Sequence, residues 1–530
     1  MKTIVIDNFS RGIADDRYNG VTGECGFCKH FDILTHPRRL QPLRGMSTDT
    51  ASTTIGNIIV ASNGFLYGVG VDGSNPSNGK LWVRADNNTT ASSTGSFGAS
   101  STWRALTNNQ LSGATVNYDL IVENPDAGQV RTLYWASNNL IVASDPLGAS
   151  SASTDALTFS SIGQGILHPK DKTIYFPYKT SSAHYIALIA PNATAFGGKN
   201  YTAFTLPFLY RCYCLSYYGN YLAIPMTSVN GIGVNGSVVA LWNRDTSTTT
   251  LDETIPWGAG KLQVLNNLNG VLVGVNTLSA AYSGSFQDYD AIQIKMWAGG
   301  AEPTLLKELK AIHLAGSNQP TVTINPRVNF IYNNRLYFSV NVNPNDGKQA
   351  AWYGLWSVGK NKLTGEWTVS MERVETNSNT GTGVIAAAIS GDFVSMAHTA
   401  EGTLTYTSNG VTSSSTYGAT SVYESLVNPG MDPADKMRKK KLYAIQVNCL
   451  PLPSSASLVL KYRIDSDGDS SDWVTLKTYS TTDGSSFDVP NIPSSGKSDG
   501  YNIELRLEST GGAVPIAFAY KYDVLSSNTL

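Results

Sequence analysis

A short unit recurs along this sequence: a tight polar turn followed directly by a compact apolar strand. It is clearest in IYNNRLYF at 331–338, where apolar pairs flank Asn333 and Asn334. Such residues between two apolar runs are typical of a two-residue β-hairpin loop. The turn and its strand occur at 63–70, 138–144, 171–178, 219–226, 269–275, 333–340 and 391–397. This recurrence indicates a fold built from repeated hairpins.

Each unit extends beyond its hairpin. A further short strand precedes the turn, and a third strand follows it after a loop of variable length. Four of the third strands end in an apolar residue followed by Trp: Leu81-Trp82, Leu241-Trp242, Met296-Trp297 and Leu355-Trp356. A fourth short strand completes an antiparallel meander. Four-stranded units repeated about every 40 to 50 residues are typical of the blades of a β-propeller.

The propeller solves a physical problem of the single unit. A lone four-stranded sheet leaves its faces and its two edges exposed to water. Stacking such sheets around an axis buries the faces, and an indole between two of them buries roughly 150–250 Å². We therefore predict about seven blades over 50–427. The alternative is a series of unrelated β-sandwich hairpins, which the variable spacing favours and the recurring apolar-Trp pair opposes.

Two regions of different character flank the predicted propeller. Residues 1–49 show little regular pattern and predict an extended arm that packs on the propeller rim or on a neighbouring subunit. Residues 428–441 combine Pro and Gly with a basic run, which indicates a linker. Residues 442–530 contain about six clearly alternating segments, which predict a β-sandwich. The predicted fold class is all-β.

Composition excludes several classes of protein. Charged residues make up 15% of the chain, against about 25% in an average soluble protein. The net charge of -2 gives no global electrostatic case for binding nucleic acid or a membrane surface. We find no signal peptide and no apolar run long enough to span a membrane. Five Cys do not form a disulfide framework, so we expect synthesis in a reducing cytoplasm.

The sequence carries no short catalytic motif. It has no paired-His metal motif, no nucleophile elbow and no phosphate-binding Gly loop. Some propellers are glycosidases that act through carboxylates. The stretch SDGDSSDW at 466–473 only loosely resembles the Ser-x-Asp-x-Gly-x-x-Trp box of sialidases, and it lies outside the predicted propeller. We therefore expect neither an enzyme nor a cofactor.

Two clusters of potential metal ligands have simpler interpretations. Carboxylates around Gly468 resemble a Ca²⁺ loop, but Leu476 stands where a bidentate acid is expected, so an acidic hairpin tip is favoured. These carboxylates are Asp465, Asp467, Asp469 and Asp472. A second cluster, Cys25, Cys28, His30 and His36, could supply zinc ligands, but its spacing is irregular and incidental thiols are favoured.

Two basic stretches, HPRRLQPLR at 36–44 and KMRKKK at 436–441, are candidate contact surfaces. They could face phosphates, bond carboxylates of a neighbouring subunit, or simply be solvated. The aromatic residues that accompany cations in nucleic-acid sites are absent. The hypothetical interface residues are Arg38, Arg39, Lys439, Lys440 and Lys441.

Both ends of the chain resemble one family. IDNFSRGIADD at 6–16 and the segment 29–44 resemble the N-terminal region of structural proteins of tailed bacteriophages that contain a β-propeller. The segment 423–442 is similar to the connection between their two modules, and 460–522 to their closing sandwich. The matched positions in the sandwich are Tyr462, Arg463, Trp473, Leu476, Arg506, Leu507 and Pro515.

The resemblance implies a part of a virion. Proteins of this kind include the tail nozzle, or tail tubular protein B-like, components, which form a hexameric ring through which the genome leaves. It implies a homo-oligomer, made in the host cytoplasm, that contacts other tail proteins such as the adaptor and fibres. A transient contact with exiting DNA stays open. The pair Cys25 and Cys28 is not associated with the family.

Two rival functions remain at this stage. The first is a host-glycan-binding receptor protein or glycosidase of the virion, in which surface Tyr and Trp stack on sugars. The second is a cellular propeller that binds protein partners.

Overall fold

The computed structural model describes most of the chain. The described residues are 1–49, 53–60, 66–72, 75–84, 104–105, 121–126, 129–136, 139–145, 152–156, 159–190, 199–230, 233–247, 250–278, 291–311, 321–343, 351–377, 383–390, 393–398, 404–407, 420–466, 470–481, 492 and 497–525. No helix among them is long and apolar enough to cross a membrane.

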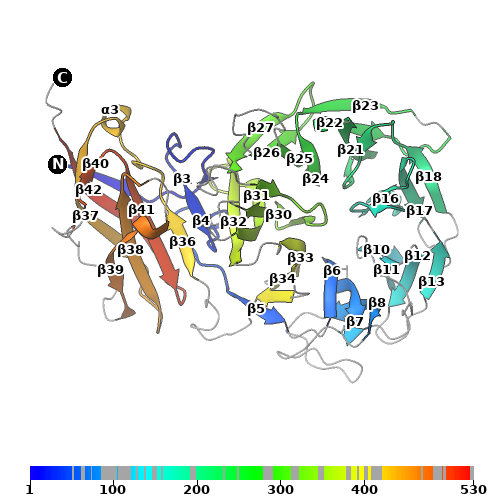
Figure 1. Cartoon of the computed structure of the whole chain (residues 1–530), viewed down its shortest axis with the longest axis horizontal. Helices are drawn as coiled ribbons and strands as arrows, with labels where there is room; N and C mark the ends of the chain where they lie inside the picture. The colour runs from blue at the N-terminus through cyan, green and yellow to red at the C-terminus, as the bar shows by residue number, and fades with distance from the viewer. Residues whose placement is uncertain are drawn as a thin grey trace.

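Seven antiparallel sheets of the described chain follow one another around a common centre, in the manner of propeller blades (Figure 1). Blade one is β6–β9 (Thr53–Val60, Leu66–Asp72, Asn75–Arg84, Arg104–Ala105) and blade two is β10–β13 (Ile121–Asp126, Gln129–Ala136, Asn139–Asp145, Ala152–Ala156). Blade three is β14–β18 (Ser161–Ile162, Ile166–Leu167, Ile174–Lys179, His184–Ile189, Lys199–Thr205). Blade four is β19–β23 (Tyr210–Arg211, Ser216–Tyr218, Tyr221–Asn230, Gly233–Trp242, Glu253–Gly258).

The remaining blades complete the ring. Blade five is β24–β27 (Lys261–Leu268, Val271–Leu278, Ala291–Trp297, Thr304–Lys310). Blade six is β28–β32 (Thr321–Thr323, Asn329–Tyr332, Arg335–Asn343, Ala351–Lys360, Trp367–Asn377). Blade seven is β33–β35 (Val384–Ser390, Phe393–His398, Leu404–Thr407) with β5 (Met46–Asp49) from the N-terminal region. The predicted all-β propeller is confirmed.

The ring closes through non-covalent contacts between its two ends. Strand β5 precedes blade one in the sequence but pairs antiparallel with β35, so it supplies the outermost strand of blade seven. The innermost strand of blade seven, β33, contacts the innermost strand of blade one, β6. This arrangement pairs the outer edge of β35, which would otherwise be open to another chain.

The hairpin turns that recur in the sequence join the innermost and second strands of the blades. Asn269 and Gly270 both have positive φ, 55° and 85°, between β24 and β25. Asn333 and Asn334 do the same, at 47° and 59°, between β29 and β30. Positive φ at both central residues is the geometry of a type I′ turn, whose twist matches that of the flanking strands.

Replacing Gly270 with Ala is expected to lower the free energy of unfolding by about 1–2 kcal/mol. A Cβ at this position meets no atom within 4 Å, so the cost comes from the backbone conformation and not from a clash. Urea denaturation measures the loss. Gly270→Asn is the control and should lose less, because Asn adopts positive φ more readily than Ala. Equal losses for both variants would contradict a turn-based origin.

The Trp residues of the third strands pack against the preceding blade. Trp242 and Trp356 are completely buried and Trp297 nearly so. The ring centroid of Trp242 lies 5.4 Å from Phe204 of blade three, and that of Trp297 lies 4.9 Å from Tyr218 of blade four. Trp356 belongs to the same core cluster as the apolar face of blade five. The side chain of Trp82 lies outside the described part of the structure.

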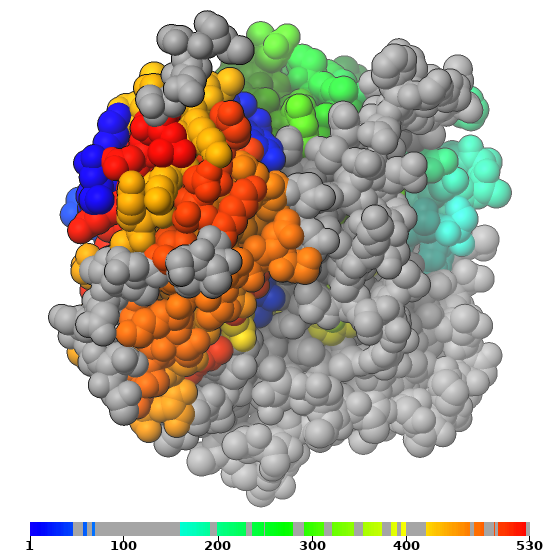
Figure 2. Space-filling model, turned by 60° about the vertical axis from the view of Figure 1, so that its left-hand side comes forward, coloured from blue at the N-terminus to red at the C-terminus, as the bar shows by residue number. Residues whose placement is uncertain are grey.

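The C-terminal region is a two-sheet sandwich that also contains strands from elsewhere in the chain. One sheet has the order β1-β42-β37-β40 and the other includes β36-β41-β38-β39. The bounds are β1 Lys2–Ile6, β36 Ser421–Glu424, β37 Lys440–Cys449, β38 Ser457–Ile464, β39 Val474–Tyr479, β40 Asp499–Gly500, β41 Ile503–Thr510 and β42 Pro515–Val524. In Figure 2 the N-terminal strand (blue) lies beside the C-terminal strand (red) on the surface of this sandwich.

A continuous sheet joins the propeller to the sandwich. Strand β4 (Phe27–Lys29) bridges to β32 of blade six through Met371 and Lys29, and it pairs antiparallel with β36. Strand β36 in turn pairs with β41 of the sandwich. The short strands β2 (Gly12–Ile13) and β3 (Glu24–Cys25) join the same sheet. Residues 1–49 therefore supply strands to the sandwich, to the connection and to blade seven.

The segment predicted as a linker, 428–441, is ordered against the sandwich. It contains the short helix α3 (Pro433–Lys436) and the first two residues of β37. Asn428 fixes its start, because its side chain accepts the backbone N–H of Ile503 at 3.0 Å and donates to the carbonyl of Tyr501 at 2.9 Å. A short 3-10 turn, η1 (Ser470–Asp472), precedes β39.

Candidate functional site

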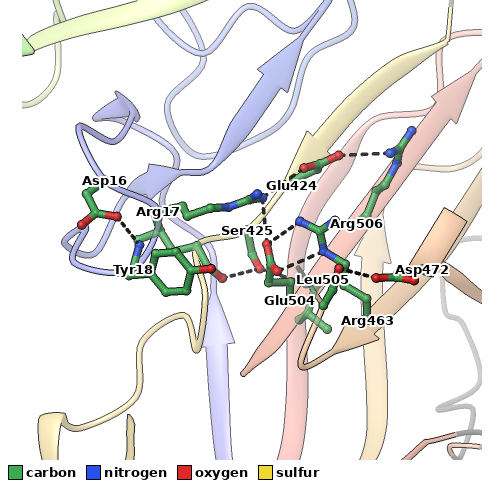
Figure 3. Close-up of polar contacts among 12 residues, drawn as sticks. Asp16, Arg17, Tyr18, Glu424, Ser425, Arg463, Asp472, Glu504, Leu505 and Arg506 are labelled. Carbon is green, nitrogen blue, oxygen red and sulfur yellow. Dashed lines mark hydrogen bonds and ion pairs between the residues drawn. The ribbon is translucent and has the colours of Figure 1, made fainter. Parts of the chain in front are cut away.

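A network of ion pairs lies where the N-terminal arm, the end of the propeller and the sandwich meet (Figure 3). Arg17 of the arm lies 2.8 Å from Glu504 on β41 and 3.4 Å from Glu424 on β36. Arg463 on β38 makes two hydrogen bonds to Glu504, at 3.0 and 2.9 Å. Arg506 on β41 binds the other oxygen of Glu424 at 3.0 Å. The network therefore joins three segments that are distant in the sequence.

The network is shielded from water. The side chains of Arg463 and Glu504 are 2% and 5% exposed. The ring of Trp473 stacks against two of the cations, with its centroid 4.3 Å from the guanidinium of Arg463 and 5.6 Å from that of Arg506. A buried charge is tolerated only when it is paired and hydrogen-bonded, and each of these arginines has a carboxylate partner.

The sequence singled out one side of this network and missed the other. Arg463, Trp473 and Arg506 were among the positions that carry the family resemblance. Arg17 and Glu504 were not identified, because in the sequence they cannot be told apart from charged residues that are simply solvated. Only their pairing across the fold distinguishes them, and no local pattern encodes it.

The arm also contacts the propeller directly. Arg11 makes two hydrogen bonds to Glu366, which follows β31 of blade six, at 3.0 and 2.6 Å. Asp32 of the arm lies 3.0 Å from Arg335 on β30. Burial opposes ionisation of Asp32, but the guanidinium of Arg335 and hydrogen bonds from Thr35 hold its pKa below the ordinary value. The arm is therefore fixed to blade six by buried and half-buried charges.

The second candidate site is a cavity of about 800 Å³ on the propeller axis. Its described lining residues come from blades three, four, six and seven, which lie on opposite sides of the ring. The innermost strand is interrupted in blades three, four and six, and the interruptions at 163–165, 212–215 and 324–328 contribute residues to the wall.

Blades three and four approach each other closely at the cavity wall. The backbone N–H of Gln164 donates to the carbonyl oxygen of Tyr213 at 2.9 Å. A Cβ on Gly163 would lie 2.5 Å from the same carbonyl oxygen, so this position requires Gly. The wall is therefore built by backbone contact between blades, which fixes the positions of the side chains that point from it.

Basic side chains gather in this cavity. Lys179, Arg211 and Arg327 line it, and no Asp or Glu does so among the described lining residues. Burial lowers the pKa of Arg327 to about 10. Burial, together with the nearby charges of Lys179 and Arg211, lowers the pKa of His184 to about 4, so this imidazole is neutral at pH 7. The cavity is electropositive without it.

Stability is expected to fall as the pH is lowered from 7 to 4.5. Burial lowers the pKa of His398 to about 4, whereas an unfolded His has a pKa of about 6.5. Between these values the unfolded chain binds more protons than the folded chain, so the free energy of unfolding decreases with decreasing pH. His398 is 4% exposed and should contribute about 2–3 kcal/mol to this loss.

Urea denaturation at pH 7 and pH 4.5 measures this pH dependence. His398→Leu should show a smaller loss between the two pH values, because the variant has one titrating group fewer. The same loss in the variant and the parent protein would contradict the assignment to His398.

The structure places the five predicted interface residues differently. Arg38, Lys439 and Lys441 are exposed, and Lys439 forms an ion pair with Asp499 at 2.6 Å. Arg39 is half-buried and lies 3.4 Å from the imidazole of His36.

The prediction for Lys440 is wrong. Its side chain is completely buried, and its ammonium donates to the carbonyl oxygens of Asp435, Lys436 and Arg438 at 3.0, 3.0 and 2.7 Å. Lys440 therefore satisfies the free carbonyls around the end of α3 and cannot contact a neighbouring subunit.

The described members of the two clusters of potential metal ligands make other contacts. Cys25 and Cys28 are buried, and the thiol of Cys25 lies 3.2 Å from the carbonyl oxygen of Gly12. Asp465 accepts the backbone N–H groups of Tyr501 and Asn502 at 2.7 and 2.8 Å. Asp467 and Asp469 lie outside the described residues. Within the described part of the chain, no three His, Cys, Asp or Glu side chains form a group that could hold a metal ion.

Comparison with known proteins finds similarity to solved structures but not to a known family. No protein-family model matches this sequence, and no curated protein matches it. The β-propeller domain of the Trilobed protease from Pyrococcus furiosus is similar at 7% identity and a TM-score of 0.39, over 67% of this chain and 93% of that chain. The Dos1 propeller is 11% identical with a TM-score of 0.38, over 69% and 95%.

A third similar structure is an enzyme. A Trypanosoma rangeli sialidase in complex with sialic acid is 10% identical with a TM-score of 0.32, over 91% of this chain and 96% of that chain. At such identities these comparisons show the fold alone.

The prediction that this chain is not an enzyme is wrong in view of these folds. Besides the sialidase, the similar structures include an exo-β-1,3-galactanase from Phanerochaete chrysosporium, an α-L-arabinanase from Penicillium chrysogenum and an acylaminoacyl peptidase from Pyrococcus horikoshii. The prediction relied on the absence of short motifs. Residues that line a propeller axis come from separate blades, so a search for short motifs does not detect a site there.

Proposed function

We propose that this chain is a structural component of a bacteriophage tail, in which the arm holds propeller and sandwich together as one assembly unit. One observation supports this proposal above the others. The residues that carry the resemblance at the two ends of the sequence come together at one junction. Phe9 of the arm packs against Phe518 of the sandwich and Tyr423 of the connection, with ring centroids 6.4 and 5.3 Å apart.

The same junction accounts for the contacts of the sandwich motif. Arg463 is linked to Arg17 of the arm through Glu504, and Arg506 binds Glu424 of the connection. The backbone N–H of Leu40 in the arm donates to the carbonyl of Pro515 at 2.9 Å. In a tail part that transmits contacts between neighbouring proteins, such a junction prevents the two modules from moving independently. The continuous sheet from blade six to the sandwich has the same effect.

The proposed assembly is a closed ring of identical subunits, through which the genome leaves the virion. A ring requires a heterologous interface that closes on itself, and obligate interfaces often bury more than about 2,000 Å². The propeller is complete in itself, so the outer surface of the sandwich is the natural interface. Exposed residues around α3 are suited to this contact: Met437 is 82% exposed, and Lys439 and Lys441 are exposed beside it.

Light scattering after size-exclusion chromatography, with negative-stain images of the same fractions, tests the proposal. The purified chain should form closed rings, and Lys439→Glu combined with Lys441→Glu should shift them to monomers. Lys310→Glu, on the exposed end of β27, is the control and should leave the rings intact. A protein that is monomeric at every concentration would contradict the ring and favour a cellular propeller with protein partners.

A further inference from the structure

We propose that the axial cavity binds an anionic saccharide, that is, a sugar-sized ligand with a carboxylate or phosphate group. The inference concerns the propeller axis and does not depend on the proposed tail function. It rests on the charge of the cavity, on the neutral groups between the charges and on the cavity's size.

The charge of the cavity differs from that of the rest of the molecule. The chain as a whole has nearly balanced charge, with 38 basic and 40 acidic residues. In the cavity, Lys179, Arg211 and Arg327 face a wall to which the described chain contributes no carboxylate. Three cationic side chains that line one cavity favour an anionic ligand there.

The three cations come from different blades, so the fold brings them together. Lys179 ends β16 of blade three, Arg211 ends β19 of blade four, and Arg327 lies in the interruption between β28 and β29 of blade six. A fourth cation lies behind this group: the ammonium of Lys261 is 4.8 Å from the ring centroid of Tyr213, which lines the cavity. Arginine binds carboxylate and phosphate groups through paired hydrogen bonds.

Neutral polar groups and one accessible aromatic residue occupy the wall between the charges. Thr321 and Thr323 on β28 are two residues apart, so they share one face of the strand, and both are exposed. Tyr213, which is half-buried, lines the same space, whereas Tyr178 borders it but is buried against Tyr185. Hydroxyl groups exchange hydrogen bonds with sugar hydroxyls, and tyrosine rings stack on the apolar faces of sugars. A simple inorganic anion would accept hydrogen bonds from the hydroxyls but would not stack on the ring of a tyrosine.

The size of the cavity also favours a sugar over an inorganic ion. Cavities that hold small organic ligands measure about 300–1,000 Å³, and this one is about 800 Å³. It therefore accommodates one or two sugar rings with their acidic substituent, whereas a phosphate ion alone would leave most of it filled with water.

Isothermal titration calorimetry of the full-length protein tests the proposal with a panel of probes. The acidic probes are glucuronic acid, galacturonic acid, N-acetylneuraminic acid and glucose 6-phosphate, which separate carboxylate from phosphate recognition. Glucose and galactose are the neutral controls, and inorganic phosphate is the control for charge alone. At least one acidic sugar should bind with a Kd of about 1 mM or below, and the neutral sugars at least tenfold more weakly.

The variants locate the binding site. Arg211→Gln should weaken binding of the acidic sugar at least tenfold, and Lys179→Gln should weaken it as well. Both side chains are at least partly exposed, so the variants should fold, and a thermal melt checks this. Arg438→Gln, an exposed arginine beside α3, is the matched control and should bind as the parent protein does.

Three results would overturn the proposal. The first is no binding by any acidic sugar, the second is equal binding of neutral and acidic sugars, and the third is binding of inorganic phosphate alone. Light scattering on the same samples keeps this test separate from that of the ring. Acidic sugars bound by a monomer would support the cavity proposal while contradicting the ring, and a ring without binding would do the opposite.

Discussion

Replacing Trp356 with Ala is expected to lower the free energy of unfolding by about 3–5 kcal/mol. Trp356 is completely buried on β31, the third strand of blade six. It shares a core cluster with Val273 and Val275 of blade five and lies 6.4 Å, centroid to centroid, from Phe338 on the neighbouring strand. Truncation removes the largest side chain between two blades and leaves a cavity that their rigid sheets cannot close.

Urea denaturation of the parent protein and the variant measures this loss. Trp367→Ala is the matched control, because Trp367 begins β32 of the same blade but is only half-buried. It should cost clearly less than the Trp356 variant. A denaturation midpoint that Trp356→Ala leaves unchanged would contradict the role of this indole in blade packing.

Replacing Glu504 with Ala is expected to lower the free energy of unfolding by a similar amount, about 3–5 kcal/mol. Glu504 is the carboxylate partner of both Arg463 and Arg17. Its removal deletes both hydrogen bonds that Glu504 accepts from the guanidinium of Arg463, a side chain that is only 2% exposed. The desolvation of that charge is then offset by fewer contacts, and the arm loses one of its contacts with the sandwich.

Glu366→Ala is the matched control for Glu504→Ala. Glu366 also makes two hydrogen bonds to an arginine, Arg11, but its side chain is 39% exposed and water screens the pair. The loss there should be about 0–1 kcal/mol. Denaturant titrations of both variants give the comparison. Equal losses would show that burial does not determine the strength of these pairs, contrary to our expectation.

The parts of the fold that depend on neighbouring residues could be predicted from the sequence. The turn at Asn333 and Asn334 was identified because positive φ at both positions favours Asn, and the alternation around it defines the strands. The apolar-Trp pairs were also identified from local sequence, and Trp242 and Trp297 occupy equivalent places in their blades, each opposite the second residue of the neighbouring strand. Trp356 lies two residues earlier in its strand, opposite Phe338. Blade number followed from counting these local units.

The candidate sites could not be predicted in this way. Arg211 and Arg327 are separated by more than a hundred residues in the sequence and face one cavity only because the blades form a ring. The pairing of Arg17 with Glu504 likewise depends on the path of the arm. Lys440 resembled its exposed neighbours in a basic run, but its place at the start of β37 directs it inward, toward the carbonyls around α3.

The sequence by itself therefore determined the strands, the turns and the number of blades, because hairpin geometry and side-chain alternation depend on residues a few positions apart. Tertiary structure alone decided how the ring closes with β5, how the arm connects propeller and sandwich, and which charges meet on the axis. These features depend on contacts between residues far apart in the chain. Such contacts form only when hydrophobic burial has brought the sheets together. The residues next to a charged side chain in the sequence do not indicate which distant residue it will pair with.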